Sequence, residues 1–308
     1  MGSRRALGTG GEAVAGGRGE AVRSPEDSLR RVLERPRYEL VPTEDALEQI
    51  SYLPPKAEVA ITCSPTLGID STLALAGMLS DQGFRAVPHL AARQVESEAH
   101  LRAILHRLNA TSIGEVFVVG GDARWVAGPY AGGLDLLRTM GRLEHDLRRI
   151  GVPAYPEGHP FIRDDELVRV LLAKQDFASY VVTQICFDSG TILSWLERMR
   201  EGGLVLPVYA GVPGAVDRGR LLRVSLKIGV GSSLRYLRKQ HGLAGRLLLH
   251  SDYAPDELVE ALSPFLGDGG IHGLHFNTFN QVERTERWRR GMLASLDGDE
   301  SRSSGETP

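Results

Sequence analysis

Short strand-like runs alternate with amphipathic helical segments along this chain, and the alternation limits the possible folds more than any other feature. Eight runs rich in β-branched and aromatic residues cover positions 38–41, 58–63, 85–90, 115–120, 152–155, 180–187, 204–209 and 270–277. Apolar residues recur at spacings of three and four in segments 70–80, 97–108, 133–150, 164–176 and 191–200, which indicates helices. Eight alternations within about 260 residues favour an α/β fold with a single (β/α)8 TIM barrel, because a doubly wound sheet of this length usually has fewer strands.

The ends of the chain differ from the barrel region in composition. Residues 1–25 are rich in Gly, Ala, Arg and Glu without periodic apolar residues, and residues 297–308 are similarly polar. Such segments cannot bury enough apolar surface to fold, so both are expected to be disordered tails. The barrel domain is therefore predicted over 26–296. Segment 221–264 has more helical character than one repeat requires, which predicts an extra helix late in the barrel.

Composition and charge narrow the classes of partner. The 308 residues include 42% hydrophobic and 24% charged residues, which is typical of a soluble globular enzyme. A net charge of -3 provides no electrostatic footprint for nucleic acid or an anionic membrane, so a small-molecule ligand is expected. The chain has neither a membrane-length apolar run nor a secretory h-region, and a cytoplasmic location is expected. The histidines show no metal-ligand spacing, and Cys63 and Cys186 are interpreted as reduced core residues, so no metal is predicted.

Polar residues stand where most of the predicted strands end. The active site of a TIM barrel lies at the carboxyl ends of its strands. A short apolar run, for example, leads into the segment AYPEGHP (154–160), whose prolines stiffen the loop that follows it. The polar residues at the strand ends are Glu39, Thr62, His89, Asp122, Tyr155, His159, Gln184, His275 and Asn277. One such residue would be unremarkable, but the set as a whole predicts a site at this end of the barrel.

Several of these residues lie in motifs that resemble a known family. The segments are YEL (38–40), PHL (88–90), GGD (120–122), AYPEGHP (154–160), TQ (183–184) and HFNTFN (275–280). In their order and spacing across residues 37–290 they resemble the methylenetetrahydrofolate reductase family, and AYPEGHP is the most specific of them. The resemblance implies a barrel enzyme that reduces 5,10-methylenetetrahydrofolate to 5-methyltetrahydrofolate with NADH or NADPH, usually through bound FAD.

The resemblance also implies roles for single residues. Glu39 resembles the family's general acid, which helps to open the imidazolidine ring of the folate. A partly desolvated carboxyl group at a barrel mouth would have a raised pKa and keep a proton near neutral pH, although Glu39 could instead be paired with a nearby arginine. Asp122 is expected to bind the pterin and tune its electrostatics. Gln184 is expected to hydrogen-bond the pterin, or alternatively to satisfy backbone groups of the barrel. Asn277 is a further candidate for substrate binding.

Binding of FAD is less well supported by the sequence. The positions that match the family's cofactor contacts are Thr62, His89, Tyr130, Ala131, Tyr155, His159 and Lys174. Gly120 replaces the arginine that would face phosphate, and Leu167, Val170 and Ala173 stand where the family has polar contacts. Arg93 or Arg124 could substitute, because a pyrophosphate needs cations or convergent N–H donors. Weak or absent FAD binding is therefore expected.

Two mechanisms and two rival functions follow. Either NAD(P)H reduces bound FAD, which then reduces the folate, or NAD(P)H passes its hydride directly to the folate, which the eroded FAD contacts favour. One rival is a folate- or nucleotide-binding barrel without catalysis, but Glu39, Asp122 and Gln184 are all present. The other is a different flavin barrel such as a proline dehydrogenase, for which no amino-acid-binding arginines are found. The choice between NADH and NADPH and the oligomeric state stay open.

Overall fold

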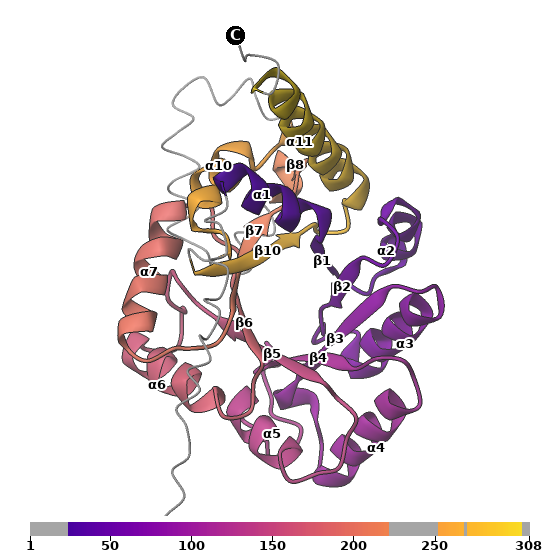
Figure 1. Cartoon of the computed structure of the whole chain (residues 1–308). Coiled ribbons are helices and arrows are strands. Elements are labelled where there is room, and N and C mark those ends of the chain that lie inside the picture. Colours follow the sequence, from indigo (N-terminus) through magenta and orange to yellow (C-terminus); the bar gives the residue numbers. More distant parts are fainter. Residues whose placement is uncertain (1–23, 222–251, 268–269, 304–308) are drawn as a thin grey trace, which may run out of the picture.

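Eight parallel strands close into a barrel in a computed structural model that describes residues 24–221, 252–267 and 270–303 (Figure 1). Around the barrel the order is β1-β10-β7-β6-β5-β4-β3-β2. The strands are β1 (Arg37–Leu40), β2 (Glu58–Ile61), β3 (Arg85–Ala91), β4 (Glu115–Val119), β5 (Arg149–Ala154), β6 (Tyr180–Thr183), β7 (Val208–Pro213) and β10 (Ile271–Asn277). The predicted α/β class and TIM barrel are confirmed.

Helices surround the barrel and cover its outer face (Figure 1). They are α1 (Pro25–Glu34), α2 (Glu44–Gln49), α3 (Gly68–Asp81), α4 (Glu98–Asn109), α5 (Gly133–Met140), α6 (Asp164–Lys174), α7 (Ser189–Glu201), α10 (Asp256–Leu262) and α11 (Val282–Ser303), with short 3-10 turns η1 (Ile50–Tyr52), η2 (Ala92–Gln94) and η4 (Ser263–Phe265). Helix α4 shows why they pack: Leu101, Ile104, Leu105 and Leu108 form one buried stripe at spacings of three and four. Strands β8 (Val216–Asp217) and β9 (Asp252–Tyr253) form a separate antiparallel pair.

Some predicted boundaries are wrong. The helix expected over 133–150 ends at Met140, because β5 begins at Arg149, where it pairs with Glu115 of β4. The strand expected over 204–209 occupies Val208–Pro213 instead, and the sixth strand ends at Thr183 rather than at 187. Apolar residues continue beyond these limits, but there they pack in loops and helix ends, which a hydrophobic run does not distinguish from a strand.

The remaining predictions concern the late barrel and the tails. Most of the segment expected to hold an extra helix, residues 222–251, lies outside the described residues, although 218–221 are helical. The N-terminal tail lies outside them up to residue 23, and α1 begins at Pro25 with Ser24 as its cap. Helix α11 continues beyond residue 296, the predicted end of the barrel domain, to Ser303. Within the described ranges, no helix has the length and apolar character needed to cross a membrane.

Alternate residues of each strand point into the barrel. Tyr38 and Leu40 pack in the core between strands and helices, so Arg37 and Glu39 point inward. The inner middle layer is apolar and includes Ala60, Val87, Phe117 and Val182. This layer separates a charged cluster at the amino ends of the strands from the polar residues at their carboxyl ends.

The charged cluster fills the amino-terminal end of the barrel. Arg37, which is 4% exposed, forms an ion pair with Glu58 and donates to Glu115 Oε1 at 3.2 Å and Tyr180 Oη at 2.8 Å. Arg149 donates to Glu115 Oε2 at 3.0 Å. Since the side chains occupy this end, the opposite end is the one available to a ligand.

Candidate active site

The predicted site residues on seven strands reach the carboxyl-terminal mouth of the barrel. Parallel strands bring these ends together, so residues far apart in the sequence become neighbours. The residues are Glu39 of β1, Thr62 after β2, His89 of β3, Asp122 after β4, Tyr155 and His159 after β5, Gln184 after β6 and Asn277 of β10. Their side chains interact in two groups, one around Glu39 and one around Asp122.

Glu39 lies beside His275 inside the barrel. The Oε2 atom of Glu39 is 3.4 Å from Nε2 of His275, and the side chains are 22% and 5% exposed. Strands β1 and β10 pair with Glu39 opposite Asn277, and Thr278 Oγ1 donates to the Glu39 carbonyl at 2.7 Å. This hydrogen bond and the strand pairing fix the backbone on both sides of the Glu39–His275 contact. Among the described residues the ionic partner of Glu39 is thus a histidine, not the arginine considered from the sequence.

This contact changes the electrostatics expected for Glu39. Burial raises the pKa of the Glu39 carboxyl, but the hydrogen bond and charge of His275, with a contribution from His89, outweigh burial and hold the pKa below its ordinary value. Burial lowers the pKa of His89 to about 4, so the His89 ring is neutral at pH 7. The sequence-based expectation of a raised Glu39 pKa is therefore wrong.

Asp122 faces the aromatic side chains of the AYPEGHP loop. The Tyr155 and His159 rings meet edge to face with their centroids 5.1 Å apart. Burial and the nearby Asp122 charge raise the pKa of Tyr155 to about 12. Burial lowers the pKa of His159, while Asp122 opposes this shift. Tyr155 is thus a neutral hydrogen-bonding phenol at neutral pH, next to a carboxylate.

The loops that carry Asp122, Tyr155 and His159 contain tight turns at glycines. Gly158 has a φ of +79°, which favours glycine, and its N–H donates to the Tyr155 carbonyl at 3.0 Å. Gly121, directly before Asp122, has a φ of +89°, and a Cβ there would lie 2.9 Å from Cβ of Ala91. Both glycines allow a tight turn, and the turns bring Asp122 and His159 toward each other.

The other predicted residues differ in their hydrogen bonds and in their burial. The Gln184 N–H donates to the Ala154 carbonyl at 2.7 Å, whereas its side-chain amide has no hydrogen bond to any described residue. Asn277 Nδ2 donates to the Val212 carbonyl at 3.3 Å, so part of this amide holds β10 against β7. Thr62 lies above β2, and its carbonyl accepts from Thr72 Oγ1 at 2.9 Å. Tyr130 is buried and Ala131 exposed, both before α5.

Lys174 is not brought together with the other predicted residues. It is the last residue of the 11-residue helix α6, which runs away from the mouth for about 16 Å. The next residue, Gln175, bonds the Gly203 carbonyl and the Val205 N–H in the segment that leads to β7. Burial lowers the pKa of Lys174 to about 8. Lys174 therefore lies toward the amino-terminal end of the barrel.

The residues present fit the pyrophosphate of FAD poorly. Gly120 supplies no cation, and Lys174 lies toward the other end of the barrel. Nη2 of Arg93 donates to the Arg124 carbonyl at 3.3 Å, and the Arg124 guanidinium lies 5.5 Å from the centre of the Trp125 ring. Both arginines are near the mouth, and the buried Nε of Arg93 has no hydrogen-bond partner among the described residues, so Arg93 is the cation best placed to substitute.

His275 is the residue that the sequence reasoning undervalued. The sequence placed it among the polar residues at strand ends but assigned it no role. The alternation of side chains along β10 indicates its position, because Leu274 and Phe276 pack outward while His275 and Asn277 share the inner face. The contact with Glu39 could not be inferred, since the two residues are 236 positions apart.

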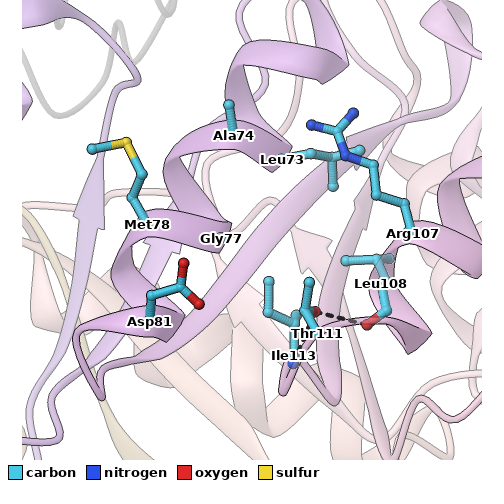
Figure 2. Close-up of a pocket in the computed structure, with 9 residues that line it drawn as sticks. All are labelled: Leu73, Ala74, Gly77, Met78, Asp81, Arg107, Leu108, Thr111 and Ile113. Carbon is cyan, nitrogen blue, oxygen red and sulfur yellow. Dashed lines mark hydrogen bonds between the residues drawn. The ribbon is translucent and has the colours of Figure 1, made fainter.

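A pocket also lies outside the barrel, between α3 and α4 (Figure 2). It has a volume of about 280 Å³ and is lined by apolar residues that include Leu73, Met78 and Leu108, with Asp81 and Arg107 at its sides. Both helices stand on the outer wall of the barrel. This pocket is therefore separate from the mouth, and none of the predicted site residues lines it.

Known proteins resemble this chain in sequence and in fold. Residues 59–287 match the family model described as methylenetetrahydrofolate reductase. Methylenetetrahydrofolate reductase 1 of Schizosaccharomyces pombe is 30% identical over 134 residues, which cover 40% of this chain and 22% of that protein. Methylenetetrahydrofolate reductase 2 of Saccharomyces cerevisiae is 24% identical over 165 residues, which cover 50% of this chain and 26% of that protein. The matched parts are thus small fractions of these longer relatives.

A solved structure supports the same architecture. An uncharacterized protein from Clostridium thermocellum that binds two copies of 5-methyl-5,6,7,8-tetrahydrofolic acid superimposes with a TM-score of 0.56. It is 14% identical in sequence, and the alignment covers 86% of this chain and 99% of that chain. At this identity the likeness concerns the fold.

Proposed function

Since this chain belongs to the methylenetetrahydrofolate reductase family, we propose that it reduces 5,10-methylenetetrahydrofolate to 5-methyltetrahydrofolate with NADH or NADPH. The reduced folate occupies the barrel mouth, where Glu39, Asp122 and Gln184 lie at the ends of β1, β4 and β6. We further propose that the hydride passes directly from the dihydronicotinamide to the folate.

Ring opening is the first chemical step. The bond between the bridging methylene carbon and one folate nitrogen breaks, and the electron pair stays on that nitrogen. A proton from Glu39 Oε2 neutralises this nitrogen, which leaves the methylene carbon in an electrophilic iminium with the other nitrogen. Glu39 suits this role because it points into the barrel at its mouth and remains 22% exposed, within reach of a ligand.

Hydride transfer is the second step. C4 of the dihydronicotinamide delivers a hydride to the iminium carbon, which becomes the methyl group, and the oxidised nicotinamide leaves. Asp122 binds the pterin and its charge favours the cationic iminium. The side-chain amide of Gln184 supplies both a donor and an acceptor for the pterin edge, and its lack of a described protein partner supports this role.

The direct route is supported by the replacement of several groups that a flavin would need. Gly120 has no cation to offer, and Leu167, Val170 and Ala173 present no charge along α6. A pyrophosphate without cations would lose the charge-assisted hydrogen bonds that usually hold it. The observation that carries the proposal is therefore a mouth that keeps Glu39, Asp122 and Gln184 together while the pyrophosphate contacts are missing.

The test follows oxidation of NADH and NADPH by the purified protein with 5,10-methylenetetrahydrofolate, with and without added FAD, while its visible spectrum is recorded. Turnover by colourless protein that does not respond to FAD is the expected result. Turnover that requires FAD would restore the flavin route. Folate binding without turnover under any of these conditions would favour a non-catalytic folate-binding barrel.

A further inference from the structure

His275 and Glu39 form a pair inside the barrel. The His275 ring is 5% exposed, and Nε2 lies 3.4 Å from Glu39 Oε2. The other ring nitrogen, Nδ1, is buried and has no hydrogen-bond partner among the described residues. Among the described residues, Glu39 is thus the hydrogen-bond partner of the His275 ring. A change in the charge of either group therefore acts electrostatically on the other across this short distance.

We propose that His275 is a positioning residue that stores the proton delivered by Glu39 to the leaving nitrogen of the folate. This inference rests on the proposed function, which needs a proton donor at Glu39. It also explains how a carboxyl group that is ionised in the free protein can act as an acid. The proton resides on Nε2 of His275 until the substrate is bound.

Binding of the folate makes transfer of the proton from His275 to Glu39 favourable. The proposed proton store is an imidazolium beside a carboxylate that is 22% exposed to water at the mouth. A bound folate displaces this water, and two opposite charges that lose their solvation become less favourable than a neutral imidazole beside a neutral carboxylic acid. The proton then passes from Nε2 to Oε2 and onward to the folate nitrogen as the carbon–nitrogen bond breaks. After product release, a proton from water restores the imidazolium.

The other groups that face the pair do not replace this function. His89 faces it from β3, but burial lowers its pKa to about 4, and its neutral ring packs on Phe117 with centroids 4.7 Å apart. Arg37 lies two residues before Glu39 on β1, and its charge is balanced by Glu58 and Glu115. Asn277 shares the inner face of β10 but carries no charge and donates to the Val212 carbonyl.

The first test is the pH profile of kcat for the wild type, His275→Gln and Glu39→Gln. A glutamine at 275 still donates to Glu39 but cannot store a proton, so the pH above which kcat falls should move down by about one unit or more. At pH 7.5 this variant should lose about tenfold or more in kcat and recover as the pH is lowered, with folate affinity unchanged. Glu39→Gln should be slow at every pH. A loss in His275→Gln that is the same at all pH values would overturn the inference.

The second test does not depend on turnover. Nuclear magnetic resonance of 15N-histidine-labelled protein follows the titration of the His275 ring, whose signal is identified by its absence in His275→Gln. The Glu39→Gln variant should lower the pH at which the ring loses its proton, because the carboxylate no longer stabilises the imidazolium. An unmoved titration would contradict the pairing, whether or not the wild type reduces folate. Exposed His106 on α4 serves as the control, and His106→Gln should change neither readout.

An inactive wild type with a coupled His275 titration would refute the reductase proposal while keeping the pair. An active wild type with an uncoupled His275 would refute only the role of the pair.

Discussion

Arg37→Met should destabilise the fold strongly although the residue lies at the end of the barrel opposite the site. Arg37 is 4% exposed and bonds Glu58, Glu115 and Tyr180. Its guanidinium also lies 4.5 Å and 4.4 Å from the centres of the Tyr180 and Tyr209 rings. Methionine keeps much of the volume but removes the charge, so two carboxylates that are each 8% exposed lose their shared cation.

The size of this effect follows from the partners that remain. Removing one partner of a buried ion pair costs about 3–5 kcal/mol, because the other charge stays buried without compensation. Arg85 remains 3.0 Å from Glu58 and Arg149 remains 3.0 Å from Glu115, so we expect the lower part of this range, about 3 kcal/mol. Urea unfolding at pH 7.5, followed by circular dichroism, measures the difference.

Arg85→Met provides the matched control. Arg85 also pairs with Glu58, but its side chain is 61% exposed, and an exposed ion pair contributes about 1 kcal/mol or less. Adding Glu58→Gln and Glu115→Gln to Arg37→Met should recover part of the lost stability, because no buried carboxylate then lacks its cation. If Arg37→Met lowers the free energy of unfolding no more than Arg85→Met does, the buried cluster does not stabilise the barrel.

Three further changes test the site and its surroundings. Glu39→Gln should keep the fold and folate affinity but lower turnover by about 10²-fold, the scale of a lost general acid, and near-normal turnover would remove Glu39 from that role. A Cβ at position 120 would meet no atom within 4 Å, and Gly120→Arg should raise FAD affinity at least about tenfold in a fluorescence titration by restoring one charge-assisted contact. Gly77→Arg on α3, where a Cβ is equally unobstructed, should not, and equal affinities would refute the missing-cation argument. Lys174→Met should stabilise the protein at pH 7 by up to about 3 kcal/mol and leave the KM of the reductant unchanged, because the folded-state pKa is lowered from 10.5 to about 8. The penalty for charged Lys174 is complete below pH 8 and disappears above 10.5, so this gain should vanish at high pH; a raised KM would instead place Lys174 in the nucleotide site.

The sequence predicted the barrel because its strands are short apolar runs and its helices have a clear period. It also predicted that Glu39, Asp122 and Gln184 reach the same end of the barrel, since each follows or ends a parallel strand. The helix beyond Met140 was overpredicted because loop residues 141–148 continue the apolar spacing, whereas the pairing of Arg149 with Glu115 decides where β5 begins.

Long-range contacts were beyond the reach of the sequence. The partner of Glu39 is His275, 236 positions away, and only closure of the barrel between β1 and β10 brings them together. The apolar sequence neighbours of Glu39 predicted a raised pKa, whereas His275 reverses the direction of the Glu39 pKa shift. Lys174 was aligned with a family position, but the length of α6 places it toward the amino-terminal end of the barrel.

Isotope transfer tests the central claim most directly. The protein is given NADH or NADPH deuterated at the transferred C4 position together with 5,10-methylenetetrahydrofolate, and the 5-methyltetrahydrofolate formed is analysed by mass spectrometry. Direct hydride transfer predicts one deuterium in the methyl group of each product molecule. A hydrogen that passes through a flavin nitrogen exchanges with water, so a product methyl group without deuterium would contradict the account.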